Sequence, residues 1–210
     1  MRRRALVLTG LAIALCAPAA VRAAAPEPLT AEQKARVDDA NAYLSGLQSV
    51  RGKFTQSDPQ GGLSSGTFWL KRPGRARFQY DPPADMLVVS DGYNVMVNDR
   101  RLKTFDQYPL GSTPLGLLLG KQVRLDRGVV ISAVVVAADG FSITARDGRK
   151  AADGALTLKF SASPLALTGW TVVDGQGGRT QVALGPLEPV ADLDPKLFVL
   201  RDPRPRTRQP

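Results

Sequence analysis

Turn sequences divide most of this 210-residue chain into short segments, and this division limits the fold more than any other feature. Glycine supplies the positive φ that tight hairpin turns need, and it recurs beside Asp or Pro between apolar segments. Four such turns stand at Pro73-Gly74, Asp91-Gly92, Asp139-Gly140 and Asp174-Gly175. Between turns the side chains alternate, so that Ala76, Phe78 and Tyr80 share one strand face. Successive hairpins predict an antiparallel meander rather than βαβ units.

The alternating segments predict a mainly β domain. We expect strands at residues 50–57, 67–71, 75–80, 86–89, 93–97, 129–137, 141–145, 156–160, 170–173 and 179–184. A last strand at residues 197–200 would close the sheet. The apolar fraction of 43% is ordinary for a globular protein, and this length suits a single domain.

One helix is predicted ahead of the strands. Thr30 to Gln33 fits a capping box, in which the Thr hydroxyl accepts from a free amide and the Gln side chain reaches back. An apolar stripe follows at helical spacing, at Val37, Ala40, Leu44 and Leu47. The glycines from Gly46 to Gly52 are expected to end this amphipathic helix.

A second, short helix is predicted at residues 112–120. Thr113 suits an N-cap, Pro114 suits the first helical position, and Gly120 suits the end. The helix is apolar nearly all round because it carries Leu115, Leu117, Leu118 and Leu119. Such a helix must be buried or must touch a hydrophobic ligand. Gly116 is expected to loosen it by about 1 kcal/mol relative to Ala.

The first 23 residues read as a cleaved secretory signal, so the mature protein is expected to be exported. Arg2, Arg3 and Arg4 precede an apolar run that is too short to span a bilayer, and Val21-Arg22-Ala23 suits a signal peptidase. An arginine pair also occurs in twin-arginine signals. We expect a folded domain at residues 24–200 and a basic, Pro-rich, disordered tail at residues 201–210.

Several classes of function are disfavoured by composition. The chain has no histidine, and its one cysteine, Cys16, lies in the leader, so His-dependent nucleophiles and His-ligated metals are excluded. Aspartates between residues 81 and 106 lie mostly in turns, where Asp bonds locally. We therefore expect neither catalysis nor a metal or cofactor. Loss of the leader leaves 24 basic and 19 acidic residues, a charge of +5 that does not favour nucleic acid.

Six short motifs occur in the same order and spacing as in a known protein family. Gly66 to Pro73 resembles a G-x-x-W-x-K-R-P segment. The others are Phe54-Thr55-Gln56, Phe78 to Pro83, Val88 to Gly92, Thr113-Pro114 with its leucines, and Asp174 to Gly177. Together, from about Thr30 to Leu200, they resemble the periplasmic outer-membrane lipoprotein carriers of the LolA family.

This resemblance implies a strongly curved, incomplete antiparallel barrel, a half-barrel covered by an N-terminal helix and a helical lid. It also implies a carrier without a cofactor. The carrier takes triacylated lipoproteins from an inner-membrane lipoprotein-releasing ABC complex, shields their acyl chains, and delivers them to an outer-membrane receptor. A monomer is expected.

The resemblance also gives roles to residues. Periodicity alone makes an apolar sheet face ordinary core, and only the resemblance makes it an acyl-chain cavity. The expected cavity residues are Trp69, Phe78, Tyr80, Met86, Val88, Tyr93 and Val95. The expected lid residues are Leu115, Leu117, Leu118 and Leu119. Arg72 is expected to bond to the lid and hold the empty carrier closed, since its guanidinium fork can bridge carbonyls at a helix end.

Three alternatives remain open. A lipid-anchored receptor of the same fold would need an acylated cysteine, but Leu15 before Cys16 fits that signal poorly. A periplasmic sensor or regulator that detects lipids, or a carrier of another lipid, would use the same fold.

Overall fold

The fold is a single curved antiparallel sheet in a computed structural model that describes residues 28–113, 115–120, 125, 128–148 and 154–204. The strands are β1 Ser49–Ser57, β2 Leu63–Lys71, β3 Arg75–Tyr80, β4 Met86–Asp91, β5 Asn94–Asp99, β6 Thr104–Pro109, β7 Val129–Val136, β8 Gly140–Asp147, β9 Ala155–Ala162, β10 Leu165–Val173, β11 Arg179–Leu184 and β12 Glu188–Pro189. The predicted leader and residues 205–210 of the predicted tail lie outside the described residues.

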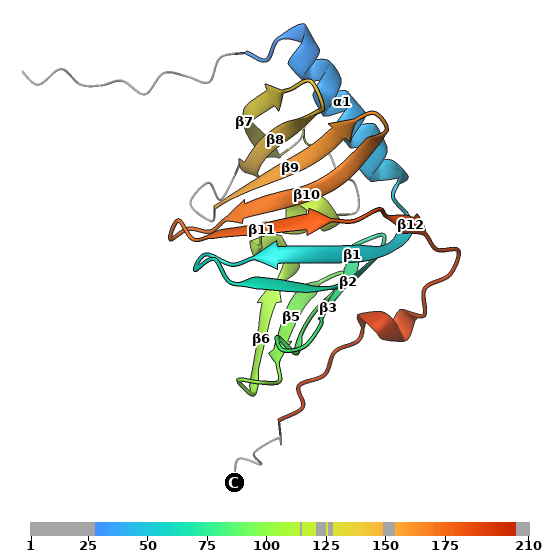
Figure 1. Cartoon of the computed structure of the whole chain (residues 1–210), viewed down its shortest axis with the longest axis vertical. Coiled ribbons are helices and arrows are strands. Elements are labelled where there is room, and N and C mark those ends of the chain that lie inside the picture. Colours follow the sequence, from blue (N-terminus) through green and yellow to red (C-terminus); the bar gives the residue numbers. More distant parts are fainter. Residues whose placement is uncertain (1–27, 114, 121–124, 126–127, 149–153, 205–210) are drawn as a thin grey trace, which may run out of the picture.

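The sheet order explains why the barrel stays open. The strands lie in the order β6-β5-β4-β3-β2-β1-β11-β10-β9-β8-β7, and β12 pairs with the start of β1. β1 therefore joins two consecutive meanders by pairing with both β2 and β11 (Figure 1). β6 and β7 lie at the two ends, and these two strands do not pair with each other. The predicted antiparallel half-barrel is confirmed.

The predicted strands differ from the observed ones at a few positions. The sequence reading missed β6 and gave β2 and β10 as too short. The prediction that residues 197–200 close the sheet is wrong, because a 3-10 helix, η3 Pro195–Phe198, lies there. Asp194 starts this turn by accepting from the Lys196 amide, and Pro195 suits its first position.

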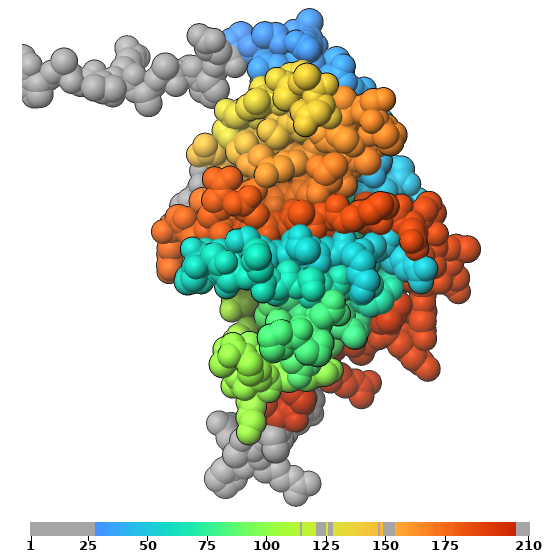
Figure 2. All heavy atoms as spheres, viewed as in Figure 1, coloured from blue at the N-terminus to red at the C-terminus, as the bar shows by residue number. Residues whose placement is uncertain are grey.

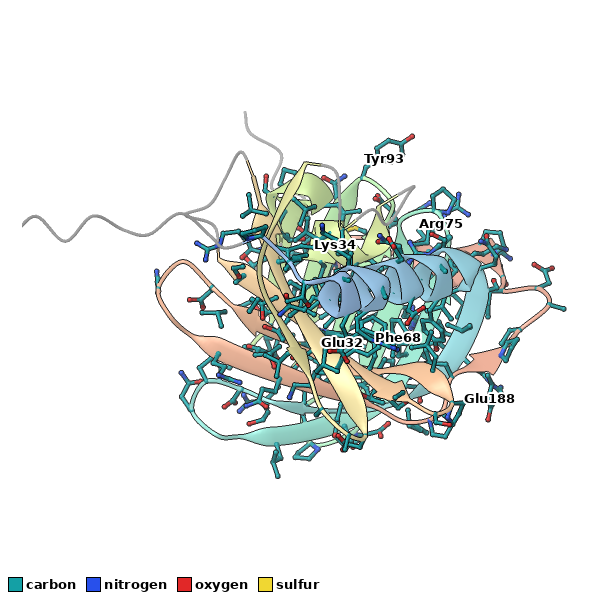
Figure 3. All side chains as sticks on the ribbon, turned by 90° about the horizontal axis from the view of Figure 1, so that it is seen from above. Glu32, Lys34, Phe68, Arg75, Tyr93 and Glu188 are labelled. Atoms are coloured by element: carbon teal, nitrogen blue, oxygen red, sulfur yellow. The ribbon has the colours of Figure 1, made fainter. Side chains whose placement is uncertain are left out.

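The N-terminal helix, α1 Ala31–Gly46, forms as predicted. Thr30 Oγ1 accepts from the Gln33 amide at 3.2 Å, and Gln33 Oε1 accepts from the Thr30 amide at 2.9 Å. Val37, Ala40 and Leu44 are buried against the sheet, where α1 packs on β7 and β10. Seen from above, α1 lies across the sheet (Figure 3).

The two sheet faces carry two separate cores. The inner face, defined here as the face that packs against α1 and the lid helix, holds the larger core. The outer face holds a smaller core of Leu87, Val89, Met96, Phe105, Leu193 and Phe198. In the space-filling view, strand side chains cover the centre and α1 shows only at the upper and right margins (Figure 2).

The chain after β12 crosses the outer face. Lys71 Nζ donates to Leu193 O at 2.8 Å, and Arg77 Nη1 donates to Leu197 O at 3.0 Å. Further on, the Arg204 guanidinium lies 5.8 Å from the centre of the Phe105 ring. Residues 201–204 of the predicted tail are thus among the described residues, and Arg204 lies beside the sheet.

Candidate functional site

Five of the seven predicted cavity residues lie on the inner face. Phe78, Tyr80 and Val95 are buried in the inner core, and Met86 and Val88 are half-buried against it. Aromatic rings that the prediction omitted complete this surface: Phe54, Phe68 and Trp170. The sequence could have predicted these three rings, because side-chain alternation gives each of them an inward-facing position in its strand.

Two predicted cavity residues are placed elsewhere, and these predictions are wrong. Trp69 lies on the outer face, packed against the second core, because side chains alternate along β2 and its neighbours Phe68 and Leu70 point inward. Tyr93 is 84% exposed, since it lies in the β4–β5 turn rather than in a strand. Figure 3 shows the Tyr93 side chain pointing away from the molecule.

The predicted lid is a single helical turn, α2 Leu115–Leu119, set against the inner core. Leu118 and Leu119 are buried, and Leu115 and Leu117 are partly buried on the same core. A 3-10 helix, η1 Leu110–Ser112, leads into it. Thr113 Oγ1 donates to Leu110 O at 2.9 Å, so its hydroxyl serves the turn before α2. Pro114 lies outside the described residues.

Gly116 has a different role from the one expected. A Cβ at this position would lie 2.8 Å from Leu110 O. The lid helix and η1 therefore approach more closely than any side chain at residue 116 would allow. Alanine would disturb this contact instead of tightening the helix.

Arg72 reaches the lid from the end of β2. Its Nη2 donates to Leu118 O at 3.0 Å, and its Nη1 donates to Gly120 O at 3.1 Å. The Arg72 Nε is buried and has no partner among the described residues. Burial lowers the pKa of the guanidinium, which still remains charged at neutral pH because arginine starts so high. Two charge-assisted bonds thus join β2 to the end of α2.

A second contact holds the chain beyond the lid. Asn41 Oδ1, on α1, accepts from the Leu125 amide at 3.0 Å, and Leu125 is buried in the inner core. The sequence reading missed Asn41, since a polar residue beside an apolar stripe carries no distinctive signal.

A groove of about 800 Å³ opens at the end of β1 that bears the β1–β2 turn. Arg72 lies near the other end, because Lys71 pairs with Ser49. Gln56 and Met86 line the inner part of the groove. Beside it, Tyr80 Oη donates to Gln56 Oε1 at 2.7 Å, and burial raises the pKa of Tyr80 to about 12.

The described residues offer no metal site: they contain no group of three or more acidic, His or Cys side chains placed to hold an ion. None of the helices in these residues has the length and apolar character needed to cross a membrane.

A family model and the curated relatives point to one family. The family described as "Outer membrane lipoprotein carrier protein LolA" matches residues 45–201. An outer-membrane lipoprotein carrier protein of Alkalilimnicola ehrlichii is 32% identical over 195 residues, covering 84% of each chain. One from Cupriavidus taiwanensis is 32% identical over 143 residues, or 62% of this chain and 63% of that protein. The match thus spans slightly less than two thirds of the Cupriavidus protein.

A solved structure is also similar. The crystal structure of a LolA superfamily protein from Nitrosomonas europaea aligns with a TM-score of 0.45 and 10% identity, covering 80% of this chain and 97% of that chain.

Proposed function

The chain belongs to the LolA family of outer-membrane lipoprotein carrier proteins, and from this premise we propose that it carries lipoproteins through the periplasm with their acyl chains on its inner face. After export and removal of residues 1–23, it takes triacylated cargo from an inner-membrane releasing complex. It then passes the cargo to an outer-membrane receptor. The role is binding and release, without a covalent step.

One observation carries this proposal: an apolar sheet face is covered by a lid helix which, in the described part of the chain, few polar contacts fix in place. Arg72 supplies two of these contacts, and the buried faces of Leu118 and Leu119 supply apolar ones. Because β6 and β7 do not pair, the sheet stays open between its two end strands, where a ligand can enter.

The physical need for shielding is large. Each methylene of an acyl chain costs about 0.8 kcal/mol when exposed to water, so about sixteen of them cost on the order of 13 kcal/mol per chain. A lipoprotein with three such chains does not diffuse freely. An apolar face that opens, fills and closes again offsets this cost.

The test is mass spectrometry of the mature protein, purified from a periplasmic extract without detergent. We expect co-purified triacylated lipoprotein. Val88→Glu, which places a charge on the inner face, should abolish co-purification, whereas Val135→Glu, at a side chain that is 59% exposed, should not. Free lipid alone would point to a carrier or sensor of another lipid. An empty protein that also fails to bind a fluorescent fatty acid would refute the proposal.

A further inference from the structure

A buried polar pair interrupts the apolar inner face. Tyr80, on β3, donates its phenol hydrogen to Gln56 Oε1, on β1, at 2.7 Å. The Tyr80 side chain is 7% exposed, and its ring meets the Phe54 ring edge-on at 5.0 Å. Gly66, on the intervening strand β2, leaves room for the Phe54 ring: a Cβ there would lie 2.7 Å from Phe54 Cε1 and would also clash with the Gln79 carbonyl oxygen. The pair is thus fixed by its surroundings.

The pair leaves one group unused. A Gln amide has a carbonyl acceptor and two N–H donors. Tyr80 occupies the carbonyl, which turns the NH₂ group of Gln56 away from the core, and Gln56 lines the groove at this end of the sheet. Within the described part of the chain, Nε2 makes no hydrogen bond to another residue. A neutral donor without a partner among the described residues therefore belongs to a residue that lines the groove.

This donor lies where an apolar surface becomes polar, and an acylated ligand likewise has an apolar chain that ends at a polar group. Along β1 the inner positions change from apolar Phe54 to polar Gln56, and on β2 the inner position opposite Gln56 is Ser64. Met86 borders both the inner core and the groove. A chain packed on the inner face with its last methylenes near Met86 would bring its polar end to Gln56.

The groove also limits what that polar end can be. Three carboxylates and one cation line it: Asp58, Asp81, Asp99 and Arg101. This balance disfavours a free carboxylate or a phosphate, whereas an uncharged carbonyl oxygen accepts a bond from an amide donor without penalty.

We propose that Gln56, held in orientation by Tyr80, donates a hydrogen bond to the carbonyl oxygen of the acyl ester linkage and so fixes which end of the cargo lies at this groove. The inference rests on the proposed carrier function. Gln56 is then a binding residue and Tyr80 a positioning residue. Burial raises the pKa of Tyr80 to about 12, so its phenol keeps its proton at neutral pH.

The experiment compares two probes that differ only in the carbonyl: 1-palmitoylglycerol, an ester, and 1-O-hexadecylglycerol, its ether. Each displaces a fluorescent fatty acid from the full mature protein. One added hydrogen bond predicts about fivefold to tenfold tighter binding of the ester by wild type. Gln56→Leu should lower ester affinity to the ether level and leave ether affinity unchanged. Tyr80→Phe should lower the ester-to-ether ratio about twofold to threefold.

A matched control is Gln181→Leu, the same change at an exposed position of β11. It should preserve the ratio. Equal binding of ester and ether by wild type would overturn the inference, and so would an equal loss of both in Gln56→Leu. If wild type and all variants bind neither probe, the proposed carrier function itself is overturned. Failure of the carrier function can therefore be told apart from failure of the Gln56 inference.

Discussion

Replacement of Arg72 by Leu most directly tests the proposed latch, meaning the two bonds by which Arg72 holds the lid closed. The side chain makes two hydrogen bonds from a charged group, at 3.0 Å to Leu118 O and 3.1 Å to Gly120 O. Such bonds contribute about 1.5–3 kcal/mol each, and the buried Nε without a partner opposes them by about 1–3 kcal/mol. The net stabilisation of the closed lid is then roughly 2 kcal/mol, or a factor of about 30 in the closed-to-open ratio.

This factor has two opposite consequences. In the proposed cycle acyl chains bind only the open form, so Arg72→Leu should tighten binding of a fluorescent fatty acid by up to about 30-fold. The same change removes the contacts that favour release, so transfer of lipoprotein to its receptor should slow. Both effects arise from one equilibrium and should appear together.

The assay measures probe affinity by titration and cargo transfer by the loss of lipoprotein from the carrier. Arg75→Leu is the matched control, because Arg75 is exposed at the start of β3 (Figure 3). It should change neither quantity. Unchanged affinity together with unimpaired transfer in Arg72→Leu would refute the latch.

Three further predictions concern stability. Gly116→Ala should lower the free energy of unfolding by about 1–2 kcal/mol, since contact with Leu110 O outweighs the gain in helix propensity, whereas Gly111→Ala, with open space around it, should not; urea unfolding measures both. Thr30→Ala should cost about 1 kcal/mol in the same assay through loss of the capping box, and an unchanged midpoint would contradict this. The pKa of Tyr80 is raised to about 12 in the folded state, so the unfolded chain loses this proton first and stability falls between about pH 10 and 12. The Tyr80→Phe protein should lack that part of the loss, on the order of 3 kcal/mol, and parallel pH profiles of the two proteins would refute the prediction.

The fold was predictable because its signals are local. Alternation within β3 and glycine turns such as Asp91-Gly92 require only neighbouring residues, and the capping box at Thr30 closes within one helical turn. The faces on which the β2 side chains lie could also be predicted from the sequence. Phe68 and Leu70 share the inner face, so the residue between them, Trp69, must lie on the outer face. The prediction of Trp69 as a cavity residue was wrong because it rested on the family motif and not on this alternation.

The rest depended on contacts between distant segments. Gln56 meets Tyr80 across β2, and Asn41 meets Leu125 from another element, so no spacing along the chain marks either pair. Phe198 looked like part of a closing strand because it is apolar. It instead covers the outer face, where the second core offers burial without strand pairing.

The lid must be only marginally stable if a carrier is to release what it binds. Burial of one acyl chain without any competing contact would give an affinity near the nanomolar range, from about 13 kcal/mol of hydrophobic free energy. Leu118 and Leu119 are buried in the inner core, and in the proposed cycle the cargo displaces them. Their return to the core, together with the two bonds from Arg72, offsets part of that free energy. On this proposal a stronger lid would exclude cargo and a weaker one would retain it, and bonds from Arg72 to backbone carbonyls can break and form again in each cycle.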